Sequence, residues 1–446
     1  MSYQLKNKIN DKSAKICAIG LGYVGLPTSI LFAQKGFQVV GCDKKADLVK
    51  SVNGGKSPRI DLQFSRRVAQ LVKTRRLQAT TDIGDGMKGA DIIIIMVDTT
   101  IDNNNNPDLR SLISAGKEVS KALKRDQLVV LVSTVPFGAT EAILEPILEQ
   151  TGLKAGRDFG LAYCPERYNP GDRKHSVDKV TRIISGINEE WASAAELLYR
   201  QISKTYLVGD IRTAEMVKLV ENAQRDLNIA FINEISTMCE KLNLDVIDVL
   251  NAASTKWNFH SYHPGGVGGH CLSKDSWYLT KAAEREDYLP EVVVMGRRIN
   301  EKIPLHIMEL LELQMKKAKL GINGLKVAIL GLSYKENIGD TRNSASLAVI
   351  EEIKKMGGRV ISIDPYIDEK TTLEIFSVDE HYRKSEVALK GADAIILMTA
   401  HKDFKALDFE KIRQELRTPI IIDVIRALSS EKMKKLGYFY SGLGRT

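Results

Sequence analysis

The stretch AKICAIGLGYVG, residues 14–25, decides how the first part of this chain folds. A short apolar segment runs directly into Gly20, Gly22 and Gly25, which have the spacing GxGxxG at the start of a predicted helix. Such a turn lets the backbone approach a pyrophosphate, which then lies at the N-terminus of the helix. The next apolar segment ends in Asp43, where a carboxylate binds a ribose 2′-hydroxyl and repels a 2′-phosphate. The spacing therefore predicts a dinucleotide site that prefers NAD to NADP.

Apolar segments of similar length recur through the first half of the chain. They are short, apolar on both faces and rich in Ile and Val, which is typical of buried parallel strands joined by helices. They comprise residues 14–20, 37–43, 90–98, 127–134 and 159–164. The pattern predicts a doubly wound α/β domain.

The middle of the chain has a different pattern. Residues 211–251 contain neither Pro nor Gly and favour a helix much longer than is usual, so we expect it to span domains or form an interface. A second helix-rich stretch runs from about residue 274 to 320. Strand-like segments then return at residues 326–333, 358–365, 392–400 and 419–424.

These patterns together predict an α/β fold with two Rossmann-like doubly wound domains, joined by a long central helix and a helical region, to which the family resemblance described below assigns dimerisation. The expected domains are residues 1–210, 211–320 and 321–446. The last residues, 437–446, are predicted to be loosely held because they end the chain. Four consecutive asparagines, residues 103–106, are interpreted as a loop.

Composition narrows the class of protein. With 43% hydrophobic and 27% charged residues, the 446-residue chain is ordinary for a globular protein. No apolar run approaches the roughly 20 residues of a membrane span, and the N-terminus lacks the apolar stretch of a signal peptide. We therefore expect a cytoplasmic location and no membrane association. The net charge of +8 admits nucleic acid or a polyanionic small molecule, such as a sugar nucleotide, as a partner.

The five cysteines argue against two kinds of site. Their number is odd and no CxxC pair occurs, so neither a disulfide framework nor a tetrahedral zinc site is expected. Cys17 and Cys42 lie in strand-like apolar segments and are interpreted as core residues.

Cys271 lies in the stretch PGGVGGHCLSKD, residues 264–275, directly behind a run rich in glycine. Bare backbone lets a ligand lie close, and a cysteine becomes nucleophilic where cations or helix-end dipoles stabilise its thiolate. The alternative is a tight turn that happens to contain a cysteine. His260, His263 and His270 lie nearby, but no Cys or carboxylate spacing completes a set of ligands, so no metal is predicted.

Lys218 and Asn222 are four residues apart in the predicted long helix, so they share one of its faces. Aimed at one point, they would form an oxyanion-stabilising pair. The alternative interpretation is a lysine that is simply solvated.

Two motifs follow predicted strands at their carboxyl ends, where open α/β sheets bind ligands. They are STVPFG (133–138) and YCPER (163–167), in which Thr134 and Glu166 either face the cofactor crevice or serve as cap or turn residues. A third motif, LGLSYKENIGDTRNS (330–344), is a glycine turn followed by cations, a combination that suits an anionic phosphate group.

The motifs GLGYVGLP, STVPFGAT, PER, AExxKLxxN, PGGVGGHCLSKD and SYKENIGDTR resemble the UDP-glucose/GDP-mannose dehydrogenase family, in the family's order and over nearly the whole chain. TKWNF (255–259), PERYNPGDRKH (165–175) and GRRIN (296–300) resemble its UDP-N-acetylhexosamine branch. Pro170 stands where the glucose branch often has a second glutamate. In VDTT (97–100), Asp98 and Thr100 replace common prolines, while Thr99 matches.

The resemblance implies a four-electron oxidation of the C6 hydroxyl of a UDP-N-acetylhexosamine, either UDP-GlcNAc or UDP-ManNAc, to a carboxylate with two NAD. By this analogy the Cys271 thiolate adds to the aldehyde formed first, and the thiohemiacetal is oxidised to a thioester that water hydrolyses. Lys218 and Asn222 would stabilise oxyanions. Asp275 and Thr134 would organise water and proton transfer, with Glu166 as the general base. A simple alcohol dehydrogenase would not need the thiol, whereas two successive oxidations require that the aldehyde be retained.

The resemblance also assigns binding residues and domains. Cofactor-binding residues are expected at Gly20, Gly22, Tyr23, Val24, Gly25, Asp43, Thr99, Ser133, Thr134 and Arg342. Substrate-binding residues are expected at Glu166, Arg167, Lys218, Asn222, Tyr262, Gly266, Gly268, Tyr334, Lys335 and Arg426. The three expected domains then bind NAD, form a homodimer and bind the UDP-sugar, with no nucleic acid partner. The alternatives are a UDP-glucose 6-dehydrogenase, a two-electron dehydrogenase of the 6-phosphogluconate type, and a non-enzymatic nucleotide or nucleic-acid binding module.

Overall fold

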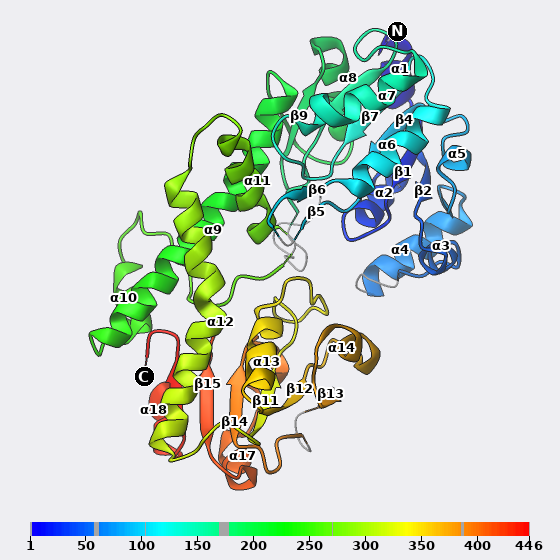
Figure 1. The fold of residues 1–446 in the computed structure, drawn as a ribbon. Helices are drawn as coiled ribbons and strands as arrows, with labels where there is room; N and C mark the ends of the chain where they lie inside the picture. Colours follow the sequence, from blue (N-terminus) through cyan, green and yellow to red (C-terminus); the bar gives the residue numbers. More distant parts are fainter. Residues whose placement is uncertain are drawn as a thin grey trace. The chain divides into compact units, whose positions relative to one another are not determined.

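The computed structural model describes residues 2–57, 62–102, 104–168, 178–269, 271–384 and 388–445. Pro170 and His270, and most of the segment 165–175, lie outside the described residues. The chain divides into two compact units (Figure 1). One comprises Met1–Glu221 and Trp277–Asp287, and the other comprises Asn222–Ser276 and Tyr288–Thr446. The division into three functional domains stays a prediction.

The first unit is built on an eight-stranded sheet with the order β10-β9-β8-β7-β4-β1-β2-β3. Neighbouring strands are parallel except β8 and β9, which pair antiparallel. The strands are β1 (Lys15–Ile19), β2 (Gln38–Cys42), β3 (Leu77–Thr80), β4 (Ile92–Ile95), β7 (Leu128–Leu131), β8 (Gly160–Tyr163), β9 (Arg182–Gly186) and β10 (Thr205–Leu207). Each of the five predicted segments contains one of these strands, so the predicted doubly wound arrangement is confirmed.

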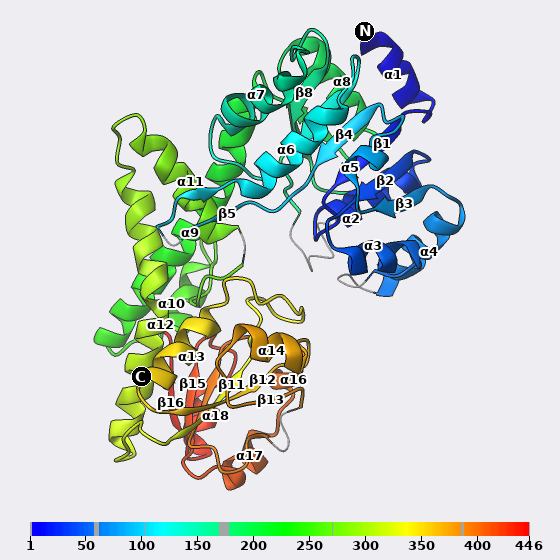
Figure 2. The ribbon, with the colours of Figure 1, turned by 45° about the vertical axis from the view of Figure 1, so that its right-hand side comes forward.

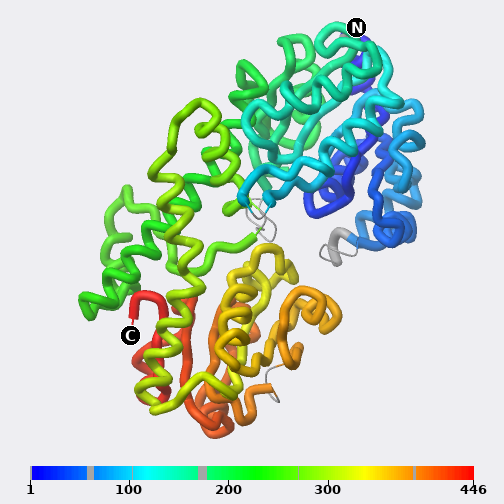
Figure 3. The backbone as a smooth tube through the Cα atoms, in the orientation of Figure 1, coloured from blue at the N-terminus to red at the C-terminus, as the bar shows by residue number. Residues whose placement is uncertain are grey.

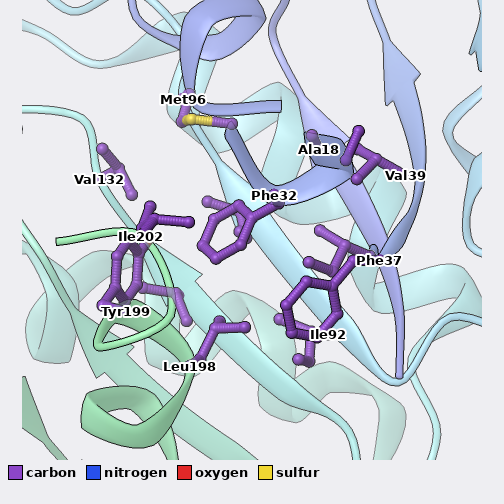
Figure 4. Close-up of a cluster of buried hydrophobic side chains, with 14 of the residues drawn as sticks. Ala18, Phe32, Phe37, Val39, Ile92, Met96, Val132, Leu198, Tyr199 and Ile202 are labelled. Atoms are coloured by element: carbon purple, nitrogen blue, oxygen red, sulfur yellow. The ribbon is translucent and has the colours of Figure 1, made fainter. Parts of the chain in front are cut away.

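Successive residues of the central strands point into two different cores. In β4, Ile92 belongs to the core on one face of the sheet and Ile93 to the core on the other. The first core, drawn in Figure 4, packs Phe32 edge-to-face against Phe37 and Tyr199. Because helices cover both faces, these strands are apolar at every position rather than at alternate ones.

Helices and short elements complete the first unit. The helices are α1 (Ser2–Asn10), α2 (Gly25–Gln34), α3 (Ala46–Asn53), α4 (Leu62–Lys73), α5 (Ile83–Gly86), α6 (Arg110–Ala122), α7 (Glu145–Leu148) and α8 (Glu189–Tyr199), with a π-helix at Thr140–Leu144 and a 3-10 turn at Glu149–Thr151. A two-stranded hairpin, β5 (Thr100–Ile101) and β6 (Pro107–Asp108), encloses Asn104, Asn105 and Asn106. The loop interpretation is confirmed for residues 104–106.

The second unit contains a six-stranded parallel sheet with the order β13-β12-β11-β14-β15-β16. Its strands are β11 (Lys326–Leu330), β12 (Arg359–Ile363), β13 (Glu380–Tyr382), β14 (Ala394–Leu397), β15 (Ile420–Asp423) and β16 (Phe439–Gly442). Helices α12 (Glu291–Lys317) and α13 (Ala345–Lys355) cover one face of this sheet (Figure 2). Further helices around this sheet region are α14 (Glu369–Ile375), α16 (Lys402–Lys405), α17 (Phe409–Glu415) and α18 (Ser430–Lys435).

Strand β16 corrects the prediction that residues 437–446 are loosely held. It pairs in parallel with β15, and Tyr440 is only 2% exposed. The prediction was wrong because the segment completes the sheet edge, and its apolar side chains are buried there.

The predicted long helix is present, but it is shorter than expected. Helix α9 (Ile211–Lys241) ends where Asn243 adopts a left-handed φ of 56°, and α10 (Val246–Ala253) starts after it. The Asp245 carboxylate caps α10 by accepting from the Ile247 N–H. Within the second unit, α9 runs beside α12, as the tube in Figure 3 shows. No helix in the described ranges combines the length and apolar character that a membrane span needs.

His306 of α12 joins three parts of the second unit. Its Nε2 and Nδ1 lie 3.0 Å and 2.9 Å from carboxylate oxygens of Glu240 and Glu309, and Glu240 also accepts from the Gly444 N–H. Burial by itself lowers the pKa of His306, but the hydrogen bonds to Glu240 and Glu309 raise it above its ordinary value. The protonated ring is therefore stabilised in the folded state.

We predict that His306 stabilises this unit in a pH-dependent way. Because its folded pKa is raised, the stabilisation is complete below the unfolded value of about 6.5 and is lost as the pH rises through the folded pKa. The difference in thermal midpoint between the wild type and His306→Gln should be largest near pH 6 and shrink toward pH 9. His260→Gln, at an exposed position, is the control and should show no such trend. A constant difference would contradict the assignment.

Candidate active site

The first glycine turn joins β1 to α2. Gly20 has a φ of 92°, and a Cβ there would lie 2.4 Å from the Met96 carbonyl oxygen. A Cβ on Gly25 would lie 1.7 Å from the Gly20 carbonyl oxygen. Both glycines are thus required by contacts within the protein itself. Gly22 differs, because a Cβ there would meet nothing within 4 Å, so its bare backbone borders open space.

Asp43 lies beside this turn, at the carboxyl end of β2. Its carboxylate accepts hydrogen bonds from the Leu21 N–H at 2.9 Å and the Lys45 N–H at 3.0 Å. The side chain is half-buried, and each oxygen keeps a further lone pair for a ligand hydroxyl. The open backbone at Gly22 and the oriented carboxylate both suit a dinucleotide with a free ribose 2′-hydroxyl.

The segments after β4 and β7 come together because these strands are neighbours in the sheet. The Ser133 hydroxyl donates to the Val97 carbonyl at 2.6 Å, and the Thr99 hydroxyl donates to the Thr134 carbonyl at 2.6 Å. The structure therefore brings Thr99, Ser133 and Thr134 to one edge of the sheet. Only Thr134 among them is half-exposed.

Glu166 follows β8 and is held by three donors. Its carboxylate accepts from the N–H groups of Arg167 and Tyr168 at 2.9 Å and 2.8 Å, and from the Arg182 guanidinium at 3.1 Å. Arg182, in β9, is 2% exposed and was not identified from the sequence. It reaches Glu166 because β9 pairs antiparallel with β8, a pairing that no local pattern reveals.

Arg167 binds elements of the protein on two sides. Its guanidinium pairs with Glu221 of α9 at 2.6 Å and donates to the Thr181 carbonyl at 2.7 Å. These contacts fix the segment after β8 to α9 within the first unit.

Helix α9 carries both Lys218 and Asn222, one turn apart, as predicted. Glu215 lies about one turn before Lys218 and was missed from the sequence. Its buried carboxylate accepts from the Gly138 N–H and, at 2.9 Å and 2.6 Å, from the Thr140 N–H and hydroxyl. Burial raises the pKa of Glu215 to about 7, although these donors oppose the shift. Glu215 thus ties the helix that carries Lys218 to the STVPFG motif.

Cys271 is exposed and immediately precedes helix α11 (Leu272–Glu284). Its carbonyl accepts from the Asp275 N–H at 2.8 Å, so it stands at the start of the first helical turn. The partial positive charge of a helix N-terminus favours an anion such as a thiolate at this position. The Asn222 amide donates to the buried Asp275 carboxylate, and the Lys274 ammonium lies 3.5 Å from it. Asn222, Cys271 and Asp275 are therefore brought together in the second unit.

The glycines before Cys271 pack against the protein's own segment 334–345. A Cβ on Gly266 would lie 2.5 Å from the Ala345 Cβ, and one on Gly268 would lie 2.7 Å from the Tyr334 Cβ. Gly269 has a φ of 88°, and its Cβ would lie 2.9 Å from the Tyr334 ring. These contacts give the bare backbone a structural reason in addition to the ligand access expected from the sequence.

The second glycine turn, which follows β11, repeats the geometry of the first. Side chains of the protein itself occupy the aspartate oxygens that stay available for a ligand in the first turn. Gly331 has a φ of 96°, and the Asp364 carboxylate accepts from the Leu332 N–H at 2.9 Å, as Asp43 does from Leu21. The same carboxylate also receives the Ser333 hydroxyl and lies 3.2 Å from the His401 ring. Burial by itself raises the pKa of Asp364, but the His401 hydrogen bond brings it below its ordinary value.

Other predicted residues have partners within the protein. The Arg342 guanidinium pairs with Asp340 at 2.7 Å. Arg426, whose φ is 54°, donates to both carboxylate oxygens of Asp245 at 2.8 Å and 2.9 Å. Tyr262 is half-buried against the small core between α9 and α10. Ligand contacts of these residues stay predictions.

We predict that Gly22→Ala folds normally but binds NAD at least about tenfold more weakly, because the methyl group fills the space a pyrophosphate needs. Gly209→Ala is the matched control, since a Cβ there also meets nothing within 4 Å. Titration of NAD by calorimetry, with thermal midpoints measured alongside, checks both variants. Unchanged NAD affinity in Gly22→Ala would exclude this turn as the cofactor site.

Three domain profiles of one family match the chain in order. The NAD binding domain of the UDP-glucose/GDP-mannose dehydrogenase family matches residues 14–203, its central domain 212–302 and its UDP binding domain 328–430.

Individual relatives match over almost the whole length. UDP-N-acetyl-D-glucosamine 6-dehydrogenase of Pseudomonas aeruginosa is 36% identical over 406 residues, which cover 90% of this chain and 94% of the relative. UDP-N-acetyl-D-mannosamine dehydrogenase of Pyrococcus horikoshii is 36% identical over 433 residues, covering 97% and 99%. A solved structure of UDP-D-ManNAc dehydrogenase from Pyrococcus horikoshii superimposes with a TM-score of 0.89 at 35% identity, covering 97% of this chain and 99% of that one. The chain therefore belongs to the UDP-glucose/GDP-mannose dehydrogenase family and is an NAD-dependent nucleotide-sugar dehydrogenase.

Proposed function

We propose that the protein oxidises the C6 hydroxyl of a UDP-N-acetylhexosamine, UDP-GlcNAc or UDP-ManNAc, to the carboxylate, in a four-electron reaction through a covalent intermediate on Cys271. The observation that carries the proposal is an exposed thiol at the N-terminus of α11, next to the Asn222–Asp275 pair. The relatives named for these two sugars support the choice of substrate.

Cys271 acts between the two oxidations. Bound NAD supplies the hydride acceptor for each of them. The thiolate adds to the C6 aldehyde left by the first oxidation and forms a thiohemiacetal, so the aldehyde is not released. Loss of a second hydride from C6 gives the thioester, and water then cleaves the C–S bond, yielding the carboxylate and the free thiol.

The remaining roles are assigned from the family resemblance. Lys218 and the Asn222 amide stabilise the oxyanions on C6, because a cation and a preorganised amide donor act strongly where water is excluded. Asp275 orients Asn222 through the hydrogen bond between them and takes part in proton transfer. Glu166, held by Arg182, serves as the general base with Thr134 beside the water.

The UDP half binds to the second α/β region, whose family profile is a UDP binding domain. Tyr334 and Lys335 of the second turn are the proposed substrate contacts there, with Arg426 as a phosphate or sugar ligand. The filled space beside Asp364 argues against a second dinucleotide in this region. We place the enzyme in the cytoplasm, a location that cell fractionation tests directly.

We predict that Cys271→Ala abolishes formation of the acid while NAD affinity stays within about twofold, because the turn after β1 is untouched. The wild type should release two NADH per UDP-sugar. UDP-GlcNAc, UDP-ManNAc, UDP-GalNAc and UDP-glucose are compared by NADH absorbance and by mass spectrometry of the product. Cys239→Ala, at a buried cysteine in the same unit, is the control and should keep its activity.

Each alternative has its own outcome in this experiment. One NADH per turnover would favour a two-electron dehydrogenase. Preference for UDP-glucose would overturn the substrate proposed here. Acid formation at the normal rate in Cys271→Ala would exclude the covalent intermediate.

We also propose that the enzyme is a homodimer that uses the exposed face of α9. Val220, Phe231 and Met238 are 50%, 55% and 51% exposed. Phe231 and Met238 follow Val220 by 11 and 18 residues, which is about three and five helical turns. The three side chains therefore form one apolar stripe along the helix. An exposed apolar stripe of this kind marks an interaction surface.

We predict that Phe231→Asp shifts the protein from dimer to monomer in analytical ultracentrifugation, because a charge in an apolar interface is desolvated without a partner. Leu373→Asp on α14, where the side chain is 57% exposed, is the control and should leave the mass unchanged. A wild type that sediments as a monomer would refute this interface.

A further inference from the structure

A buried network of polar side chains joins α9 to α12 in the second unit. Asp226 and Asn233 lie seven residues apart on α9, and Arg297 and Asn300 lie three apart on α12, so each pair shares a helix face. All four are at most 3% exposed. Buried polar groups of this kind are costly unless they are hydrogen-bonded, so their partners indicate what the network holds.

Asn233 holds the beginning of the cysteine loop, the segment from Gly265 to Cys271 that leads into α11. Its Nδ2 donates to the Gly265 carbonyl at 3.0 Å, and its Oδ1 accepts from the Gly265 N–H at 2.9 Å. Its Nδ2 also donates to the Asn300 Oδ1 at 2.9 Å. Gly265 is therefore fixed through both of its backbone polar groups, six residues before Cys271.

Asp226 holds the helix that follows the loop, α11. Its Oδ2 accepts from the Ser276 hydroxyl at 2.9 Å, five residues after Cys271. Its Oδ1 accepts from Arg297 at 2.5 Å and from the Asn300 Nδ2 at 2.8 Å. Asn300 thus connects the residue that fixes Gly265 with the residue that fixes Ser276.

Between Gly265 and the start of α11 at Leu272 the chain is rich in glycine. Glycine loses more conformational freedom on folding than any other residue, so a loop of this composition does not define the position of a side chain by itself. The contacts with the segment 334–345 pack against Gly266, Gly268 and Gly269, and the network adds an anchor on each side of them in the chain.

We propose that this network, acting through Asn233 and Asp226, positions Cys271 for attack on the aldehyde. Asn233 is a positioning residue, because it touches the loop backbone and not the thiol. The inference rests on the proposed covalent role of Cys271. It assigns to the α9–α12 contact a task in the second oxidation, in addition to stability.

The consequence concerns the fate of the aldehyde. The first oxidation requires no sulfur, whereas capture of its product requires the thiol within attack distance. A displacement of about 1 Å is enough to lower the rate of such a step about a hundredfold. A weakened network should therefore let aldehyde escape and uncouple the two oxidations.

The test uses Asn233→Ala, which removes the anchor at the start of the loop, and Ser276→Ala, which removes the anchor in the helix that follows it. In the full-length enzyme we expect free aldehyde, trapped as its oxime with hydroxylamine, and fewer than two NADH per UDP-sugar. The kcat for acid formation should fall about tenfold or more while the KM for the UDP-sugar stays within twofold. The alkylation rate of Cys271 by iodoacetamide should change severalfold. This probe is selective, because the other four cysteines are buried.

The control is Ser236→Ala, a buried position on α9 whose hydroxyl donates to the Ile232 carbonyl of the same helix. It should keep two NADH per sugar and the wild-type alkylation rate. If Asn233→Ala does not fold, the NADH yield, the trapped aldehyde and the alkylation rate of Ser276→Ala test the proposal. Folded variants that release no aldehyde and alkylate at the wild-type rate would overturn the inference. Acid production by Cys271→Ala would instead refute the proposed function.

Discussion

The close approach of the cysteine loop to the segment 334–345 is the contact on which the arrangement around Cys271 depends. It exists only because Gly266, Gly268 and Gly269 have no Cβ, since each added methyl carbon would lie under 3 Å from Ala345 or Tyr334. The same loop leads directly into α11, so the position of Tyr334 is transmitted to the residue at the start of that helix. The segment 334–345, which lies in the part of the chain that matches the family's UDP binding domain, and the loop that carries the thiol are in this way one packed structure.

The two glycine turns show how one backbone geometry serves two purposes. Gly20 and Gly331 have nearly the same φ, 92° and 96°, and each precedes an N–H that donates to an aspartate at the end of the next strand. Beside Gly22 the space is open, whereas the corresponding Ser333 turns its hydroxyl onto Asp364. A single hydroxyl and a buried histidine thus occupy acceptor sites that stay available in the first turn.

Much of the fold could be predicted from the sequence, because buried parallel strands and the GxGxxG turn are local patterns. The motifs that contain Lys218, Asn222 and Cys271 were recognisable from residue type and spacing. Arg182, Glu215 and Asn233 were not, because each acts on a residue distant in the chain: Glu166, Thr140 and Gly265 respectively. Edge strand β16 was missed for a related reason, since its burial comes from pairing with β15 and not from its own composition.

The sequence by itself determined the α/β class and the dinucleotide turn, and it supplied the candidate reactive groups, since these depend on residue type and short-range spacing. The tertiary structure alone decided what holds those groups. It placed an arginine behind Glu166, joined Asn222 to Asp275, and anchored the glycine loop through buried side chains of α9 and α12. The physical reason is that a buried polar group must find a partner within the folded chain, and that partner is chosen by packing between distant segments.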